Sequence, residues 1–138
     1  MKTILAAAFV AACLAPGAFA DAVTFAPGLW AYDGQAMLGA ATLTDSGQEC
    51  MAPGENSYDL AEVARSIADG CALTSASPVE NGYDFAIACT GGVRGELAGR
   101  IEIEGGQAEL TAQGWTGAPD TPLTLNVSAR ATRLADSC

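Results

Sequence analysis

The chain has 138 residues, with sixteen acidic side chains against six basic ones, a formal net charge of -10 and no histidine. The acidic balance argues against binding to nucleic acid or to an anionic membrane surface, because both require clustered positive charge. The absence of histidine excludes Ser-His-Asp and Cys-His nucleophile systems and imidazole metal sites. We therefore expect a protein that is not an enzyme and holds no cofactor or metal.

The first twenty residues are typical of a cleaved secretory signal peptide. Lys2 precedes an apolar run over residues 4–14, and the small residues Ala18 and Ala20 precede Asp21. The apolar run is too short to span a bilayer. The sequence therefore predicts a signal peptide over residues 1–20, cleavage after Ala20, and a single exported β-domain over residues 21–138, periplasmic or secreted and without a transmembrane segment.

A lipoprotein-type processing site over residues 10–13 is the alternative, and it would leave Cys13 lipidated at a new N-terminus. Cleavage at either place removes Lys2, the only lysine, so that five arginines face the sixteen acids and the net charge becomes -11. Both interpretations leave the same four cysteines for pairing.

The first part of the exported domain predicts a hairpin. We expect an unpaired arm over residues 21–25, a strand over 29–32, a tight turn at Asp33-Gly34 and a second strand over 35–44. A polar loop over residues 45–49 then leads to Cys50, and residues 51–56 are unsuited to a strand.

The segment from Asp59 to Asp69 predicts the one helix. Its apolar residues recur at helical spacing and form a single stripe, made of Leu60, Val63, Ala64, Ile67 and Ala68. Asp59 and Glu62 have the spacing of a capping box, and Gly70 suits a left-handed C-terminal cap. Because the helix is only about three turns long, we expect it to lie on a sheet.

The four remaining cysteines predict two disulfides, because their number is even and the chain is expected to be exported. Three pairings are open. Residues 71–89 form a predicted hairpin with a five-residue loop over 78–82, which places Cys71 opposite Cys89 at a distance that a disulfide tolerates. This geometry favours Cys71 with Cys89 and leaves Cys50 with Cys138. An all-thiolate zinc site is disfavoured, because the chain lacks a Cys-x-x-Cys pair.

Three more strands follow, each with alternating apolar and polar residues. They are predicted over residues 93–104, over about 107–115 and, after a long turn at 117–122, over 123–134. The total is about seven strands and one helix. This pattern predicts a mainly β fold, an antiparallel meander that forms a barrel-like or two-layer sheet with the helix packed over one opening or edge.

Two groups of acidic residues have alternative interpretations. Glu102 and Glu104 share one strand face at a spacing of about 7 Å that two-carboxylate hydrolysis can use, but the same face carries arginines, which favours surface ion pairs. Asp45, Glu49 and Glu55 surround Cys50, yet their spacing matches no calcium-binding loop.

Three aromatic residues, Trp30, Tyr32 and Trp115, are candidates for a binding patch. Aromatic rings of this kind can stack on a sugar or hold a peptide. The alternative is packing in the core or at an edge strand, since the chain has few other large side chains.

The chain resembles the bacterial exported proteins grouped as the domain of unknown function 3617. The matching residues are Pro27 to Trp30, Cys50, Met51, Pro53, Gly70, Cys71, Cys89, Arg133, Leu134 and Cys138. The resemblance implies an exported domain built on disulfides, and it implies no reaction.

We therefore expect an exported, non-catalytic β-domain that binds a small apolar ligand or a component of the cell envelope. The alternative is a structural or stress-related envelope protein without a small-molecule ligand, and a carboxylate-based hydrolase is the third hypothesis. A cavity larger than ~300 Å³ lined by inward residues would favour the first hypothesis.

Overall fold

The structure is a computed structural model that describes residues 21–138. The predicted signal peptide, its cleavage site and the alternative lipidation of Cys13 lie outside the described residues or at their boundary. The helix within residues 21–138 is neither long nor apolar enough to cross a membrane.

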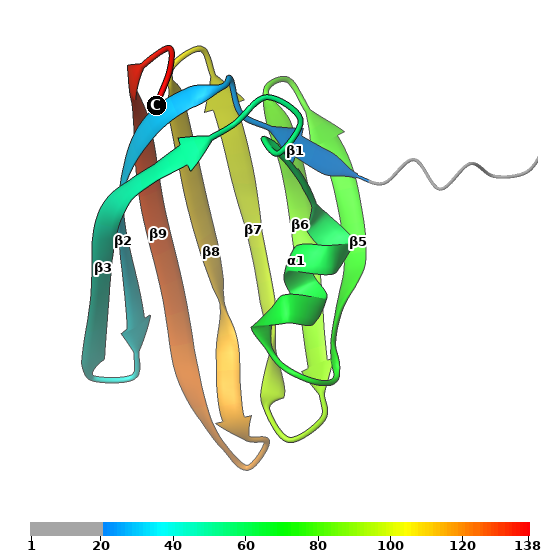
Figure 1. Cartoon of the computed structure of the whole chain (residues 1–138). Helices are drawn as coiled ribbons and strands as arrows, with labels where there is room; N and C mark the ends of the chain where they lie inside the picture. The colour runs from blue at the N-terminus through cyan, green and yellow to red at the C-terminus, as the bar shows by residue number, and fades with distance from the viewer. Residues whose placement is uncertain (1–20) are drawn as a thin grey trace, which may run out of the picture.

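The fold is a seven-stranded antiparallel sheet with a short helix and a separate two-stranded ribbon on one of its faces (Figure 1). The sheet follows the order β3-β2-β9-β8-β7-β6-β5. Its strands are β2 (Gly28–Leu38), β3 (Ala41–Met51), β5 (Cys71–Val79), β6 (Gly82–Thr90), β7 (Arg94–Glu104), β8 (Gln107–Ala118) and β9 (Thr121–Ala135). The ribbon pairs β1 (Ala22–Thr24) with β4 (Ser57–Asp59), and the helix is α1 (Leu60–Ile67).

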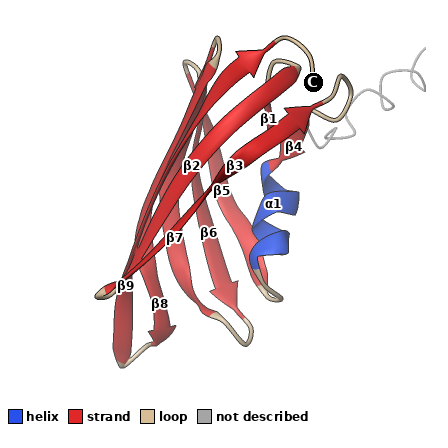
Figure 2. Cartoon of the chain, turned by 60° about the vertical axis from the view of Figure 1, so that its left-hand side comes forward, coloured by secondary structure: helices blue, strands red, loops and turns tan. Residues whose placement is uncertain are grey.

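The predicted mainly β, antiparallel fold with one helix and two disulfides is confirmed. Strands β5 to β9 form a meander, and the hairpin β2–β3 joins it through β9. The sheet is not closed into a barrel, because β3 and β5 are its two edges. It is strongly curved, and the segment that carries β4 and α1 crosses from one edge to the other on the inner side of the curve (Figures 1 and 2).

The two faces of the sheet have opposite character, as strand alternation requires. We call the face that α1 and the ribbon cover the inner face, and the opposite one the outer face. Across the register, Ala36, Val127, Ala112, Gly99 and Phe85 stand side by side on the inner face. The predicted apolar side of β7, β8 and β9 is thus the inner one, where Ala108 and Ala112 are buried.

Two hydrophobic clusters form the core. One lies under the ribbon, where Trp30, Met51 and Ala108 pack with Phe25 and Tyr58. The other lies under α1, where its members are Ala64, Cys71, Ile87 and the partly buried Ala68, Leu73, Phe85, Cys89 and Leu97. Since the clusters are separate, the inner face has two covered areas rather than one continuous core.

The first predicted hairpin is wrong in its turn. Asp33 and Gly34 lie inside β2, because each pairs with β3 on one side and with β9 on the other. The turn lies instead at Gly39-Ala40, and residues 45–49, predicted as a loop, are part of β3. The predicted arm over residues 21–25 is also corrected, since β1 finds a partner in β4.

The predicted strand pairing of the central hairpin is correct next to the disulfide and wrong next to the loop. Cys71 pairs with Cys89 and Leu73 with Ile87, as predicted. A register shift at Thr74, whose hydroxyl donates to the Ala86 carbonyl over 3.1 Å, then moves every later pair by one residue. The loop is therefore only residues 80–81, and Pro78 belongs to the strand, which β5 tolerates because it is an edge. The predicted long turn at 117–122 is likewise reduced to Pro119-Asp120.

Helix α1 begins at the predicted cap. The Asp59 carboxylate accepts hydrogen bonds from the backbone N–H groups of Ala61, at 2.7 Å, and Glu62, at 3.3 Å. The predicted end of the helix is wrong, because α1 ends at Ile67 and its C-cap is the extended Ala68 rather than Gly70. Gly70 has φ +85°, and a Cβ atom there would lie 2.6 Å from the Gly91 nitrogen, so both conformation and space require glycine.

We expect Asp59→Ala to lower the free energy of unfolding by about 1 kcal/mol, because it leaves two N–H groups of the first turn without their acceptor. Urea unfolding followed by circular dichroism measures the change. Asp69→Ala is the matched control, since Asp69 is exposed beyond the other end of the helix and acidic side chains there are not favoured by the helix dipole. Equal destabilisation by the two substitutions would contradict the capping role.

Candidate functional site

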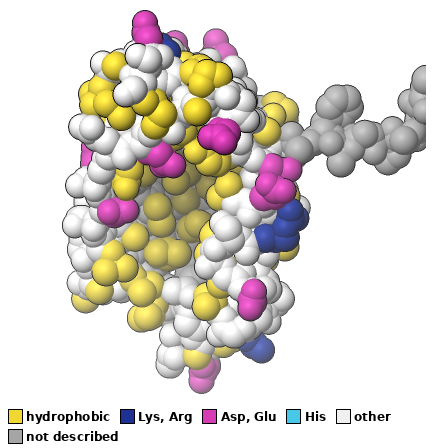
Figure 3. All heavy atoms as spheres, viewed as in Figure 1, with side chains coloured by type: hydrophobic (Ala, Val, Ile, Leu, Met, Phe, Trp, Pro, Cys, Tyr) yellow, Lys and Arg dark blue, Asp and Glu magenta, His cyan; other side chains and the backbone are white. Residues whose placement is uncertain are grey.

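A groove of ≈ 360 Å³ lies on the inner face between the two hydrophobic clusters. Residues of both clusters, of α1 and of the sheet between the clusters line the groove. The lining residues are Val23, Phe25, Glu49, Met51, Tyr58, Leu60, Val63, Ile67, Leu73, Phe85, Ile87, Leu97, Ile101, Leu110, Ala112 and Val127. Figure 3 shows this hollow, with apolar side chains inside it and acidic side chains at several points around it. We call it the inner groove.

The groove lies over the central part of the sheet, where neither cluster covers the inner face. The residues of β7, β8 and β9 that line it are all apolar: Leu97, Ile101, Leu110, Ala112 and Val127. The hollow is therefore bounded by apolar side chains on the sheet as well as on α1 and the ribbon.

Helix α1 forms one wall of the groove through its apolar stripe. Leu60 and Ala64 are buried and hold the helix on the sheet. Val63 and Ile67 line the groove and stay partly in solvent, Ile67 being 52% exposed. The predicted stripe thus both packs on the sheet and lines the groove, and Leu60 does both.

Only two lining side chains carry a polar group, Glu49 and Tyr58. The Tyr58 hydroxyl donates to the Met51 sulfur over 3.2 Å. Burial, and after it the negative charge of Glu49, raises the pKa of Tyr58. Glu49 is exposed at the β3 side of the groove and is the one charged residue in its lining.

The structure does not bring the three predicted patch aromatics together. Trp30 is 1% exposed, and its Nε1–H donates to the Ala26 carbonyl over 2.8 Å, so it belongs to the core. Tyr32 lies on the same, inner face of β2 as Trp30 and is 37% exposed. Trp115 lies on the outer face, opposite Glu96 in the register. The aromatic residues that do line the groove are Phe25, Tyr58 and Phe85.

The predicted ion pairs on the charged strand face are present. Arg100 pairs with Asp84 at 2.6 Å and with Glu102 at 3.6 Å, and Arg130 pairs with Glu109 at 3.4 Å. The hydrogen bond from Arg100 holds the pKa of Asp84 below its usual value. Glu102 and Glu104, the residues considered for hydrolysis, lie on this exposed outer face and away from the inner groove.

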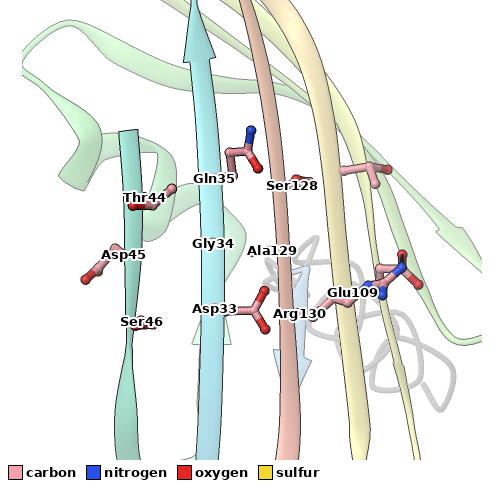
Figure 4. Close-up of a pocket in the computed structure, with 11 residues that line it drawn as sticks. Asp33, Gly34, Gln35, Thr44, Asp45, Ser46, Glu109, Ser128, Ala129 and Arg130 are labelled. Atoms are coloured by element: carbon pink, nitrogen blue, oxygen red, sulfur yellow. Dashed lines mark hydrogen bonds and ion pairs between the residues drawn. The ribbon is translucent and has the colours of Figure 1, made fainter. Parts of the chain in front are cut away.

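A second depression, of ≈ 790 Å³, lies on the outer side and is lined mainly by polar residues of β2, β3, β8 and β9 (Figure 4). It includes Asp33, Gln35, Thr44, Ser128 and Arg130, all of them exposed. A ligand there would keep much of its surface in water, whereas small-molecule sites bury most of their ligand in apolar walls. The smaller inner groove is therefore the better candidate site.

The cysteines form the two predicted disulfides, Cys50–Cys138 and Cys71–Cys89. Among residues 21–138, no group of three or more acidic or cysteine side chains is arranged to hold a metal ion. Asp45 and Glu49 lie on β3, while Glu55 lies in the turn that follows it.

Sequence patterns alone do not locate the groove. The apolar stripe of residues 60–68 and the apolar inner positions of the central strands are visible in the sequence, but whether they border one hollow depends on where α1 crosses the sheet. Comparisons of the chain with protein-family models, with curated proteins and with solved structures found no match.

Proposed function

We propose that this protein is an exported, non-catalytic β-domain that binds a small apolar molecule, or the apolar chain of an envelope component, in the inner groove. The observation that carries the proposal is the unfilled groove of ≈ 360 Å³ with a single charged residue in its lining. Its volume lies in the range of small-molecule sites, about 300–1,000 Å³.

The energetics of the inner face support this proposal. Apolar surface that stays in water costs about 25 cal/mol per Å², and folded domains rarely keep a contiguous apolar patch without a use for it. Here Val63 and Ile67 on the groove wall, and Leu43 and Leu123 on the same face beyond it, are all well exposed. A ligand chain that covered them would recover this free energy. The alternative of a structural protein without a ligand does not explain why these apolar side chains are exposed.

Export is supported by the two disulfides, since such bonds persist in oxidising compartments and are rare in the cytosol. Membership of the family of domain of unknown function 3617 remains a prediction from the resemblance. A hydrolase is less well supported, because Glu102 lies on the exposed outer face and pairs there with Arg100 at 3.6 Å.

The test uses the neutral fluorescent probe N-phenyl-1-naphthylamine and the oxidised protein. We expect its fluorescence to rise on binding, and Ile67→Asp to weaken binding about tenfold or more, because the substitution places a carboxylate against the bound probe. Leu134→Asp is the matched control, since Leu134 is 51% exposed against 52% for Ile67 and lies outside the groove.

Circular dichroism and thermal unfolding verify that both variants keep the fold. Unchanged probe fluorescence with the unsubstituted protein would contradict the proposal. So would an equal loss of binding in the two variants, since the binding surface would then lie elsewhere.

A further inference from the structure

The inner groove has one charged side chain in its lining, and this side chain is acidic. Glu49 projects from β3 at the groove's open side, and among the described residues it has no ion-pair partner. Asp45 lies on the same strand and the same face, four residues earlier, where it is opposite Gly34. Asp45 borders the outer depression and is not part of the groove lining, so Glu49 is the carboxylate that a ligand in the inner groove meets.

The positive charges lie elsewhere. Arg94, Arg100 and Arg130 are on the outer face, by strand alternation and register. Arg65 is on the side of α1 away from Val63 and Ile67, at helical spacing. Arg133 shares the inner face, opposite Trp30 and in the row that also contains Glu49. Its guanidinium, however, is bonded to the Pro27 carbonyl and pairs with Asp136 at 3.0 Å. No arginine among the described residues lines the groove.

We propose that the ligand of the inner groove is a single-chain amphiphile with a positively charged head group. This inference rests on the proposed function and specifies the chemistry of its ligand. The aliphatic chain occupies the apolar hollow, where it covers Val63 and Ile67, and the head group lies at the open side beside Glu49.

The charge pattern selects against the opposite head group. An anionic head at this place would meet Glu49 with no arginine in the groove lining to compensate it, and its approach would be opposed by the net charge of -11 on residues 21–138. An exposed ion pair contributes up to about 1 kcal/mol, which corresponds to about fivefold in affinity. We expect a cationic head to gain roughly that factor over a neutral one.

The experiment compares three ligands that share one chain: dodecylamine, dodecanol and dodecanoic acid, each below its micelle concentration at neutral pH. Displacement of N-phenyl-1-naphthylamine gives their affinities. We expect the amine to bind about fivefold more tightly than the alcohol and the acid to bind most weakly. Added salt should reduce the difference between amine and alcohol, because ions screen an exposed pair.

Glu49→Gln should abolish most of the preference for the amine while binding of the alcohol stays the same. Glu104→Gln is the matched control, because it removes the same charge from the exposed outer face. Equal affinity for the three ligands, or loss of the preference in both variants, would overturn the head-group inference alone. Failure of all three to bind would overturn it together with the proposed function.

Discussion

Trp30→Ala is expected to cost about 3–5 kcal/mol of unfolding free energy, which lowers the melting temperature by about 12–20 °C in a domain of this size. Trp30 is the one large side chain that is completely buried within residues 21–138. Its ring contacts Phe25 edge to face, with centroids 5.3 Å apart, and packs with Met51 and Ala108. Its removal opens a cavity at the point where the ribbon, β2 and β8 meet.

The loss is large because Trp30 connects separate elements. Phe25 follows β1 and Tyr58 belongs to β4, so the ribbon that borders the inner groove rests on this ring. We expect Trp30→Ala also to weaken probe binding in the groove. Since folded proteins are stable by only about 5–15 kcal/mol, the variant keeps little reserve.

Differential scanning fluorimetry or urea unfolding measures the effect, with Trp115→Ala as the matched control. The chain has two tryptophans, and Trp115 is only partly buried on the outer face, so its loss should cost roughly 1 kcal/mol. Trp30→Phe keeps a ring but leaves the Ala26 carbonyl without its donor, and should cost about 1–2 kcal/mol. Equal effects of the two alanine variants would contradict the packing described above.

Removal of the Cys50–Cys138 disulfide is expected to have the second large effect, about 4–5 kcal/mol. The bridge joins residues separated by 88 positions, whereas Cys71 and Cys89 are separated by 18. If a disulfide stabilises the protein by reducing the conformational entropy of the unfolded chain, the bridge that closes the longer loop contributes more. On this account the short bridge contributes about 3 kcal/mol. The long bridge also connects the two neighbours of β2, because Leu29 pairs with Cys50 on β3 and with Ala135 at the end of β9.

The comparison uses two double variants, Cys50→Ala with Cys138→Ala and Cys71→Ala with Cys89→Ala, each retaining the other bridge. Urea unfolding of the oxidised proteins should rank the first pair as the more damaging. Cys71 is buried against Ala64 and Ile87, so the second pair also loses packing under α1. If the second pair were clearly the more damaging, local packing rather than loop closure would govern the contribution of the bridges.

Features that depend on neighbours in the chain were predictable. The apolar stripe of residues 59–69 and its Asp59 cap describe α1, and the alternation in 94–104 and 107–112 assigns the two faces of β7 and β8. The cysteine pairing followed from one hairpin. These predictions succeeded because helix and strand periodicities place side chains without reference to the rest of the fold.

Turns that depend on more distant partners were not predictable in the same way. Asp33-Gly34 is a strong turn signal, yet β3 and β9 pair with it on both sides and keep it extended. Thr74 shifts the central hairpin by one residue through a bond to the opposite strand. In both places pairing with a neighbouring strand, rather than the local residue types, determines the path of the backbone.

The sequence by itself determined which side of each element is apolar, where the helix begins, and that the cysteines form two bridges. Only the tertiary structure decided that β9 lies between β2 and β8, that β1 pairs with β4, and that the sheet stays open at β3 and β5. The inner groove belongs to this second group. An apolar pattern indicates that burial of a surface is favourable. Whether other side chains of the same chain cover that surface depends on how distant elements pack. Here the two hydrophobic clusters leave the space between them unfilled.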